Sequence, residues 1–337
     1  MRRPLLAVAL VSTLAACDGR DARAPFIDSR PPASLAPRFW TPPGWAWGLI
    51  ETSGRPAVRY GVAGPAAAPR AHILLLTGYG ESAEAYFETV RDLTARRYVV
   101  WVLERAGQGG SGRYAGRRDL GAVASLDDDA AAARAMIDEV IRPRPGQPLV
   151  MVGQGLGGTV AAMTLGRSTR GVDGAVLSAP LLRLDRPPGL DGKIAWARRL
   201  GLSGLRPSRD GGWKRAARSD PEDRAGVQNA WQTANPDLRM GSPGLGWYGA
   251  VGDALSDLER RPVGDVAIPV LTLEAAREAE ADLKAQDKLC GRLPDCRVEK
   301  IPDAGAGLPF EADGPRGVWL AAIVAFTEAK IPKSPAP

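Results

Sequence analysis

Short apolar runs alternate with amphipathic segments along most of the chain. Runs of strand length occur at 72–78, 98–104, 148–152, 172–180, 268–274 and 296–302. Segments with helical spacing of apolar residues lie between or after them, at 82–97, 125–141, 156–167, 279–293 and 317–329. Continuous apolar strands that alternate with helices are typical of a parallel sheet covered on both faces. The pattern therefore predicts an α/β fold.

The alternation stops between about residues 182 and 262. This part is rich in Pro, Gly and Trp and has helical pieces but no clear strand. We expect an inserted cap over the carboxyl ends of the strands, where α/β proteins bind their ligands. A predicted strand pair precedes the first helix, at 47–64. We therefore expect one domain over residues 44–330, with a C-terminal tail at 331–337.

The first residues have the pattern of an export signal. Arg2 and Arg3 precede an apolar run at 5–14, and small residues lead to Cys17. The run is too short to span a bilayer stably. The sequence LAAC resembles the bacterial lipobox, in which the cysteine becomes the lipidated first residue of the mature protein. An ordinary signal peptide cleaved after Ala16 is the alternative.

We therefore expect a lipoprotein signal peptide at 1–16, lipid on Cys17 and a Pro/Ala-rich extended tether at 17–43. The expected location is the bacterial cell envelope, facing the periplasm. Asp18 resembles a retention signal of the inner membrane, which favours that membrane over the outer one.

Charge and cysteine content limit the partners and cofactors that the chain is expected to bind. The formal net charge is +6, with no dense basic stripe or nucleic-acid motif, so we expect no nucleic-acid partner. Cys290 and Cys296 are predicted to form a disulfide in an oxidising compartment, and two free thiols are the alternative. A metal site would need more soft ligands, and His72 is the only histidine. We expect no metal and no cofactor.

Several segments resemble one protein family in the same order along the chain. They are LLLTGYGESAEAY at 74–86, VLERAGQGGSGR at 102–113, VGQGLGGT at 152–159 and NPDLRMGSPGLGWYGA at 235–250. Together they resemble the monoacylglycerol lipase, lysophospholipase and serine-aminopeptidase-like group of the α/β-hydrolase superfamily, from about residue 47 to 330. The resemblance implies a mostly parallel central sheet flanked by helices, with an inserted helical cap.

The resemblance also assigns the positions of a catalytic triad. The nucleophile position is Gly155, the acid position is Arg277 with Glu278 adjacent, and the histidine position is Ala306. Glycine has no attacking atom, and alanine cannot accept a proton. All three triad residues are therefore substituted.

Backbone groups of the family site are retained, because side-chain replacement does not remove them. The resemblance places the oxyanion-binding N–H groups at Tyr79 and Leu156, beside a helix N-terminus that favours anions. Gly155 also suits the strained turn of a nucleophile elbow, since glycine reaches unusual backbone conformations at little cost.

Other residues offer alternative chemistry. His72 lies before its strand, roughly 15 Å from the catalytic edge, so we interpret it as structural. Other serines near the predicted cleft lack a histidine partner: Ser111, Ser178 and Ser242. Carboxylates for an acid–base mechanism without histidine are Glu81, Glu104 and Asp303. Asp127, Asp128 and Asp129 fit a solvated helix N-terminus better than a calcium site, and the Gly-rich turn lacks the lysine of a phosphate loop.

These observations lead to a functional prediction with one main alternative. We expect a catalytically inactive, membrane-tethered α/β-hydrolase homologue that binds a lipid or acyl ligand under the cap, or a protein partner. The alternative is an active carboxylic ester hydrolase of the lysophospholipase or monoacylglycerol lipase type, with a displaced catalytic set. A scaffold role without a ligand is a third interpretation.

Overall fold

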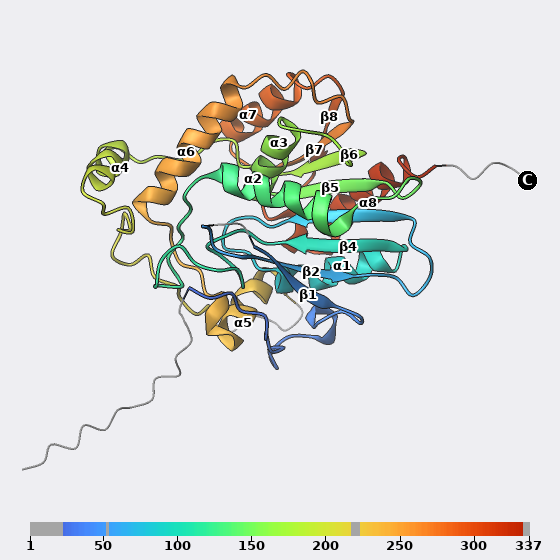
Figure 1. Ribbon diagram of the computed structural model, residues 1–337, viewed down its shortest axis with the longest axis horizontal. Coiled ribbons are helices and arrows are strands. Elements are labelled where there is room, and N and C mark those ends of the chain that lie inside the picture. The colour runs from blue at the N-terminus through green and yellow to red at the C-terminus, as the bar shows by residue number, and fades with distance from the viewer. Residues whose placement is uncertain (1–22, 52–53, 217–222, 333–337) are drawn as a thin grey trace, which may run out of the picture.

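The centre of the molecule is an eight-stranded sheet in the order β1-β2-β4-β3-β5-β6-β7-β8 (Figure 1). The computed structural model describes residues 23–51, 54–216 and 223–332. The strands are β1 (Ala46–Ile50), β2 (Val58–Ala63), β3 (Ala71–Leu76), β4 (Tyr98–Leu103), β5 (Leu149–Gln154), β6 (Gly174–Ser178), β7 (Val270–Ala275) and β8 (Cys296–Ile301). Strand β2 is antiparallel to both of its neighbours, and the strands from β4 to β8 are parallel. The mostly parallel sheet predicted from the sequence is confirmed.

Helices cover both faces of the sheet because its central strands are apolar on both sides. Every residue of β3 and β5 is buried. The helices of the alternating part are α1 (Phe87–Thr94), α2 (Leu126–Ala135), α3 (Leu156–Leu165), α7 (Glu280–Cys290) and α8 (Asp313–Glu328). Side chains of α1 and α8 belong to one core cluster, and those of α2, α3 and α7 belong to the other. The sheet therefore lies between two layers of helices, each with its own apolar core.

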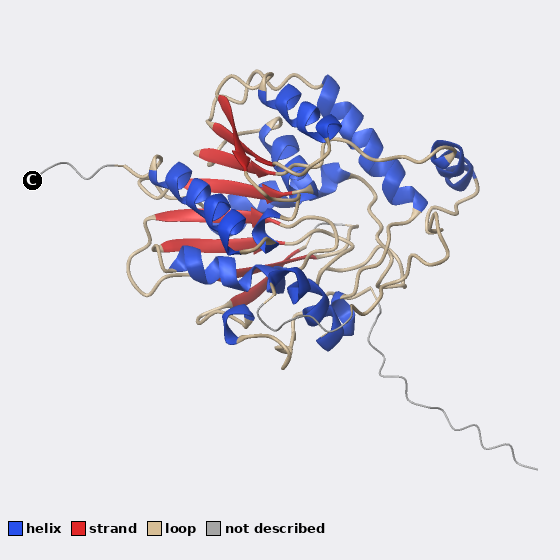
Figure 2. Cartoon of the chain, turned by 180° about the vertical axis from the view of Figure 1, so that it is seen from behind, coloured by secondary structure: helices blue, strands red, loops and turns tan. Residues whose placement is uncertain are grey.

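The stretch without predicted strands contains helices α4 (Leu190–Arg199), α5 (Val227–Ala234) and α6 (Leu245–Arg260). Its described part contains no strand. Helix α4 projects from the body of the molecule (Figures 1 and 2), whereas α6 packs against α2 and α3. Within the described ranges, no helix is both long and apolar enough to cross a bilayer.

The segment at 23–43 differs from the extended tether expected from its composition. Phe26, Leu35 and Phe39 are buried in the main core cluster. The backbone N–H of Phe26 donates to Gly110 O, and Arg30 exchanges backbone hydrogen bonds with the Asn235 side chain. Residues 23–43 are thus part of the domain, because the few large apolar side chains among the prolines pack into its core. Cys17 and the expected signal peptide lie outside the described residues, so both stay predictions.

A disulfide joins helix α7 to the edge strand β8. Cys290 ends α7 and Cys296 begins β8, with their Cα atoms 5.3 Å apart. This separation is ordinary for a disulfide. The bond fixes the C-terminal end of α7 to the exposed edge strand.

Candidate functional site

The turn between β5 and α3 has the backbone of a nucleophile elbow. Gly155 lies between the two elements with φ 52° and ψ −117°, a conformation that residues with a side chain rarely adopt. A Cβ atom on Gly157 would lie 2.2 Å from the carbonyl oxygen of Leu76, so the elbow packs closely on β3. A Cβ on Gly155, in contrast, would meet no atom within 4 Å. The central position of the elbow therefore opens into free space.

The segment after β3 faces this elbow. The side-chain amide of Gln108 donates to Gly78 O (2.6 Å) and accepts from the N–H of Gly80 (3.3 Å), which fixes the turn around Tyr79. Among the described residues, the backbone N–H groups of Tyr79 and Leu156 have no hydrogen-bond acceptor. Two free N–H groups beside a helix N-terminus can stabilise a carbonyl oxygen that gains negative charge.

Both segments line a cavity of about 480 Å³. The cavity brings Gly155 and Ala306 together with Tyr79 and Leu156, as the sequence analysis expected. Its lining residues are Gly78, Tyr79, Glu81, Gln154, Gly155, Leu156, Ala179, Pro180, Leu181, Leu182, Arg183, Asp185, Glu278, Asp282, Ala306 and Gly307. We call it the elbow cleft.

Arg277 does not line the elbow cleft, although it occupies the sequence position of the triad acid. Its side chain is 63% exposed and pairs with Glu311. Glu278 faces the cleft instead and accepts a 3.0 Å hydrogen bond from Gln286. Burial raises the pKa of the Glu278 carboxyl. The loop after β7 thus brings a carboxylate to the cleft, one position after the acid position that the family resemblance assigns.

Glu81 is the second carboxylate in the elbow cleft. Its Oε2 accepts hydrogen bonds from the Gly78 N–H (2.6 Å) and from the Tyr86 hydroxyl (2.5 Å). Burial outweighs these hydrogen bonds and raises the pKa of the Glu81 carboxyl to about 7. A carboxyl with a pKa near neutrality can both accept and release a proton at physiological pH.

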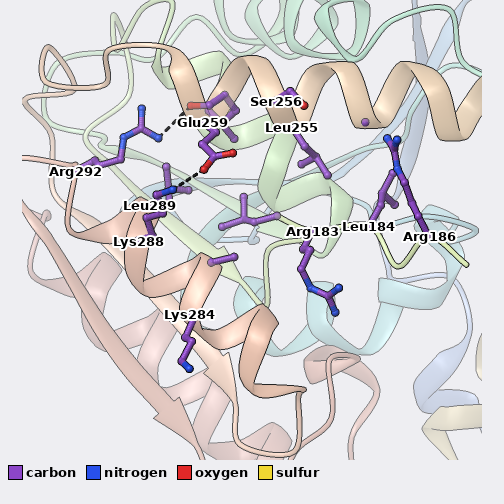
Figure 3. A pocket seen from close by; sticks show the side chains of 14 residues that line it. Arg183, Leu184, Arg186, Leu255, Ser256, Glu259, Lys284, Lys288, Leu289 and Arg292 are labelled. Atoms are coloured by element: carbon purple, nitrogen blue, oxygen red, sulfur yellow. Dashed lines mark hydrogen bonds and ion pairs between the residues drawn. The ribbon is translucent and has the colours of Figure 1, made fainter. Parts of the chain in front are cut away.

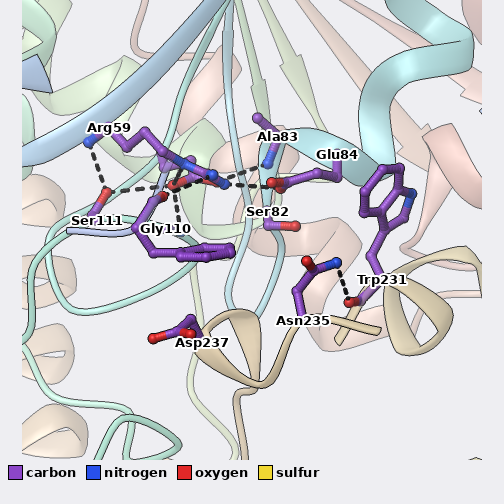
Figure 4. A network of polar contacts seen from close by, with 12 residues as sticks. Arg59, Ser82, Ala83, Glu84, Gly110, Ser111, Trp231, Asn235 and Asp237 are labelled. Atoms are coloured by element: carbon purple, nitrogen blue, oxygen red, sulfur yellow. Dashed lines mark hydrogen bonds and ion pairs between the residues drawn. The ribbon is translucent and has the colours of Figure 1, made fainter. Parts of the chain in front are cut away.

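The other carboxylates and serines proposed from the sequence have structural roles or lie elsewhere. Glu104 and Glu84 enclose the buried guanidinium of Arg59, at 2.6 and 2.8 Å (Figure 4). The Ser111 hydroxyl accepts a hydrogen bond from the Arg59 backbone in the same network. Asp303 is exposed and, like Ser242, does not line the elbow cleft. Glu104 and Ser111 are therefore excluded as catalytic groups.

Ser178 is also structural. Its hydroxyl donates to the side-chain carbonyl of Gln154 (2.6 Å) and accepts from the Trp319 indole N–H (2.9 Å). Gln154 in turn donates from its amide to the backbone carbonyl of Ala306. The sequence analysis did not predict that Gln154 connects Ser178 to Ala306. The one sequence signal for it is a polar residue at the end of an apolar strand.

The single histidine lies at the far end of the sheet from the elbow cleft. His72 is at the start of β3, where its Nδ1 accepts a hydrogen bond from the Trp101 indole N–H (3.2 Å). Burial lowers the pKa of its imidazole, which favours the neutral form. The structure thus agrees with the structural role expected for His72.

Each of the three acidic residues at the start of α2 pairs with an arginine. Asp129 forms a buried pair with Arg105, and Asp127 pairs with Arg167. The described part of the chain contains no cluster of three or more His, Cys, Asp or Glu residues placed to hold a metal ion. These carboxylates therefore anchor α2 to neighbouring segments.

Comparison with known proteins identifies the family. The sequence model of the hydrolase family named serine aminopeptidase, S33, matches residues 67–312. Lysophospholipase L2 of Escherichia coli K12 is 25% identical over 276 residues, which cover 75% of this chain and 79% of the relative. Probable lysophospholipase L2 of Haemophilus influenzae is 26% identical over 272 residues, which cover 78% and 85%.

The same architecture occurs in a solved structure, a soluble variant of monoglyceride lipase from Saccharomyces cerevisiae in complex with a substrate analogue. The two structures superpose with a TM-score of 0.67 over 85% of this chain and 96% of the lipase, at 16% identity. This similarity concerns the fold alone.

These comparisons contradict the prediction of a catalytically inactive homologue, whereas the expected membrane tether at Cys17 lies outside the described residues and stays a prediction. The curated relatives are named as lysophospholipases and match three quarters of the chain, so they favour the hydrolase alternative. The prediction relied on the substituted triad positions and on the absence of a histidine near the cleft. The matched segment spans β3 to the loop before α8 and includes the whole elbow cleft. The chain therefore belongs to the serine aminopeptidase S33 family of α/β-hydrolases.

Proposed function

We propose that this protein is a carboxylic ester hydrolase of the lysophospholipase or monoacylglycerol lipase type, in which Glu81 acts as the catalytic base. The observation that carries the proposal is the position of Glu81. Its carboxyl lines the same cleft as Gly155 and the free N–H groups, and its pKa is about 7. The relatives support the substrate class, because they are named as lysophospholipases.

The proposed reaction uses water as the nucleophile. The N–H groups of Tyr79 and Leu156 bind the carbonyl oxygen of the ester. Gly155 has no side chain, and the open space at its Cβ position leaves room for a water molecule. Ionised Glu81 accepts a proton from this water as its oxygen attacks the carbonyl carbon.

The tetrahedral intermediate then collapses. Its negative oxygen reforms the carbonyl while the bond to the leaving alcohol oxygen breaks. Protonated Glu81 returns the proton to that oxygen, so a fatty acid and an alcohol leave and Glu81 is again ionised. Glu278 is a second carboxyl in the cleft with a raised pKa, and it provides an additional proton donor to the leaving oxygen.

The test compares hydrolysis of lysophosphatidylcholine and a monoacylglycerol by the wild type and Glu81→Gln. Glutamine keeps an acceptor for the Gly78 N–H but cannot take a proton at neutral pH. We expect kcat to fall about 100-fold or more, in the range typical of a lost general base. Glu139→Gln is the matched control, since this carboxylate is exposed on the surface. Full activity of Glu81→Gln, or no hydrolysis by the wild type, would refute the mechanism.

A further inference from the structure

A second hollow lies beside the elbow cleft, between α6, α7 and the loop that follows β6 (Figure 3). Its volume is about 490 Å³, which is in the range of small-molecule sites. Its lining residues are Leu182, Arg183, Leu184, Arg186, Gly252, Leu255, Ser256, Leu258, Glu259, Lys284, Ala285, Lys288, Leu289 and Arg292. We call it the α6–α7 cleft.

The wall of the α6–α7 cleft is apolar. It contains five leucines, contributed by three segments: Leu182, Leu184, Leu255, Leu258 and Leu289. The side chains of Leu258 and Leu289 are also buried in the core, so the wall is continuous with the packed interior. A cleft of this kind removes an unbranched hydrocarbon chain from water, at a gain of about 0.8 kcal/mol for each buried CH₂ group.

The rim of the α6–α7 cleft is cationic. Its charged residues are Arg183, Arg186, Lys284, Lys288 and Arg292, with Glu259 as the one carboxylate of the lining. Glu259 pairs with Lys288. Arg292 donates to the backbone carbonyls of Leu258 and Arg261, which are neutral groups. Two carboxylates outside the lining also pair with rim cations, Asp282 with Arg183 and Asp191 with Arg186. Within the lining itself, cations outnumber carboxylates, which favours an anion over a cation as the ligand.

Arg186, one of these cations, packs against Gly252 of α6. A Cβ atom on Gly252 would lie 1.4 Å from the Nη2 of Arg186, so the guanidinium occupies the place of a side chain on α6. The carboxylate of Asp191 accepts a 2.6 Å hydrogen bond from Nη1 of the same group. Arg186 is therefore held against α6 at the rim of the cleft.

We propose that the α6–α7 cleft binds a single-chain amphiphile with an anionic head group, separately from the ester that is hydrolysed in the elbow cleft. The hydrocarbon chain packs on the leucines, and a carboxylate or phosphate head group lies among the rim cations. Arginine binds both head groups through paired N–H donors. The proposal is independent of the proposed function, because binding requires no catalytic group.

The two clefts share Leu182 and Arg183 in their linings. A fatty acid released in the elbow cleft thus has a site of matching chemistry next to it. Arg186 and Lys284 line only the α6–α7 cleft, so changes at these residues separate the two sites.

The test is displacement of a dansylated fatty acid from the full-length protein, monitored by fluorescence. Laurate and dodecyl phosphate are added below their micelle concentrations, together with the neutral dodecanol and the cationic dodecyltrimethylammonium. We expect both anions to compete at least tenfold better than dodecanol, and the cation not to compete. The ratio of laurate to dodecyl phosphate distinguishes a fatty acid site from a phospholipid head-group site.

The variant Arg186→Gln/Lys284→Gln should bind laurate at least tenfold more weakly and retain its ester hydrolysis. The control Lys193→Gln/Arg199→Gln changes two exposed cations of α4 and should bind as the wild type does. Thermal unfolding verifies that both variants fold. Equal competition by laurate and dodecanol, unchanged binding by the first variant, or absence of binding would each overturn the proposal.

Discussion

The side-chain amide of Gln154 donates a 2.5 Å hydrogen bond to the backbone carbonyl of Ala306. This bond connects the end of β5 to the loop after β8, across the cleft that both segments line. In a triad enzyme, the nucleophile and the histidine interact across the same gap. Here the two loops are aligned by backbone and amide groups, so the shape of the cleft does not depend on triad side chains.

The rate of ester hydrolysis should depend on the ionisation of Glu81. Because the Glu81 carboxyl has a pKa of about 7, only its ionised form can act as a base. We expect kcat/KM to rise with pH between about 6 and 7 and to level off above 8. A pH–rate profile without an inflection in this range would show that another group controls the reaction.

Stability should have the opposite dependence on pH. The pKa of Glu81 is raised from 4.5 in the unfolded chain to about 7 in the folded protein. The folded state therefore retains this proton as the pH rises from 4.5 to 7, and the contribution of Glu81 to stability is lost over that interval. Urea denaturation at several pH values should show a smaller decline for Glu81→Gln. Identical pH profiles for both proteins would contradict the raised pKa.

The variant Gly155→Ser should fold but should not become a rapid serine hydrolase. The new side chain meets no steric clash, but a residue with a Cβ atom is strained at φ 52° and ψ −117°, at a cost of about 1–3 kcal/mol. His72 is at the opposite end of β3, so no imidazole can activate the hydroxyl. The hydroxyl takes the place proposed for the water in the cleft that Glu81 lines, so we expect slow labelling by a fluorophosphonate probe at most, and none in Gly155→Ser/Glu81→Gln.

Adding Arg277→Asp and Ala306→His to Gly155→Ser supplies all three triad residue types at the family positions. Arg277 faces solvent, whereas Glu278 lines the cleft. We therefore expect Gly155→Ser/Glu278→Asp/Ala306→His to be labelled faster than the variant with Arg277→Asp. Rapid labelling of Gly155→Ser that persists in Gly155→Ser/Glu81→Gln would show that a base other than Glu81 serves the elbow.

The Arg59 network should contribute strongly to stability. Arg59, Glu84 and Glu104 have fully buried side chains, and removal of the guanidinium leaves two carboxylates without their cation. We expect Arg59→Met to lower the free energy of unfolding by about 3–5 kcal/mol. Arg70→Met is the control, because the Arg70–Glu328 pair is more than a third exposed and should contribute less than about 1 kcal/mol. Similar losses in both variants would contradict this assignment.

The disulfide should make a moderate contribution, because it closes a short loop. The two cysteines are six positions apart, and chain entropy gives a stabilisation of about 2 kcal/mol for a loop of this length. Replacing Cys290 and Cys296 by alanine should lower the midpoint of urea unfolding accordingly. Reduction of the wild type by dithiothreitol should reproduce the change, and an unaltered midpoint in both cases would show that the bond contributes nothing.

The fold was predictable from the sequence because its signals are local. The strands β3 and β5 are buried along their whole length and are continuous apolar runs, and the glycines of the elbow are fixed by close backbone packing. The cleft was only partly predictable. Tyr79 and Leu156 follow from their positions after strands, whereas the inward direction of Glu278 rather than Arg277 depends on the conformation of a loop. The raised pKa of Glu81 depends on burial, which no local pattern reveals.

The attachment of residues 23–43 has a practical consequence for producing this protein. The guanidinium of Arg59 donates to the backbone carbonyl of Phe26, and Arg118 donates to that of Ala24. A recombinant version that begins at the first strand, near Ala46, would discard part of the wall around a buried cation and expose the apolar surface under Phe39. A recombinant version should therefore begin no later than Arg23. If shorter versions fail to fold, the cause would be the loss of the contacts that residues 23–43 make with Arg59 and the core.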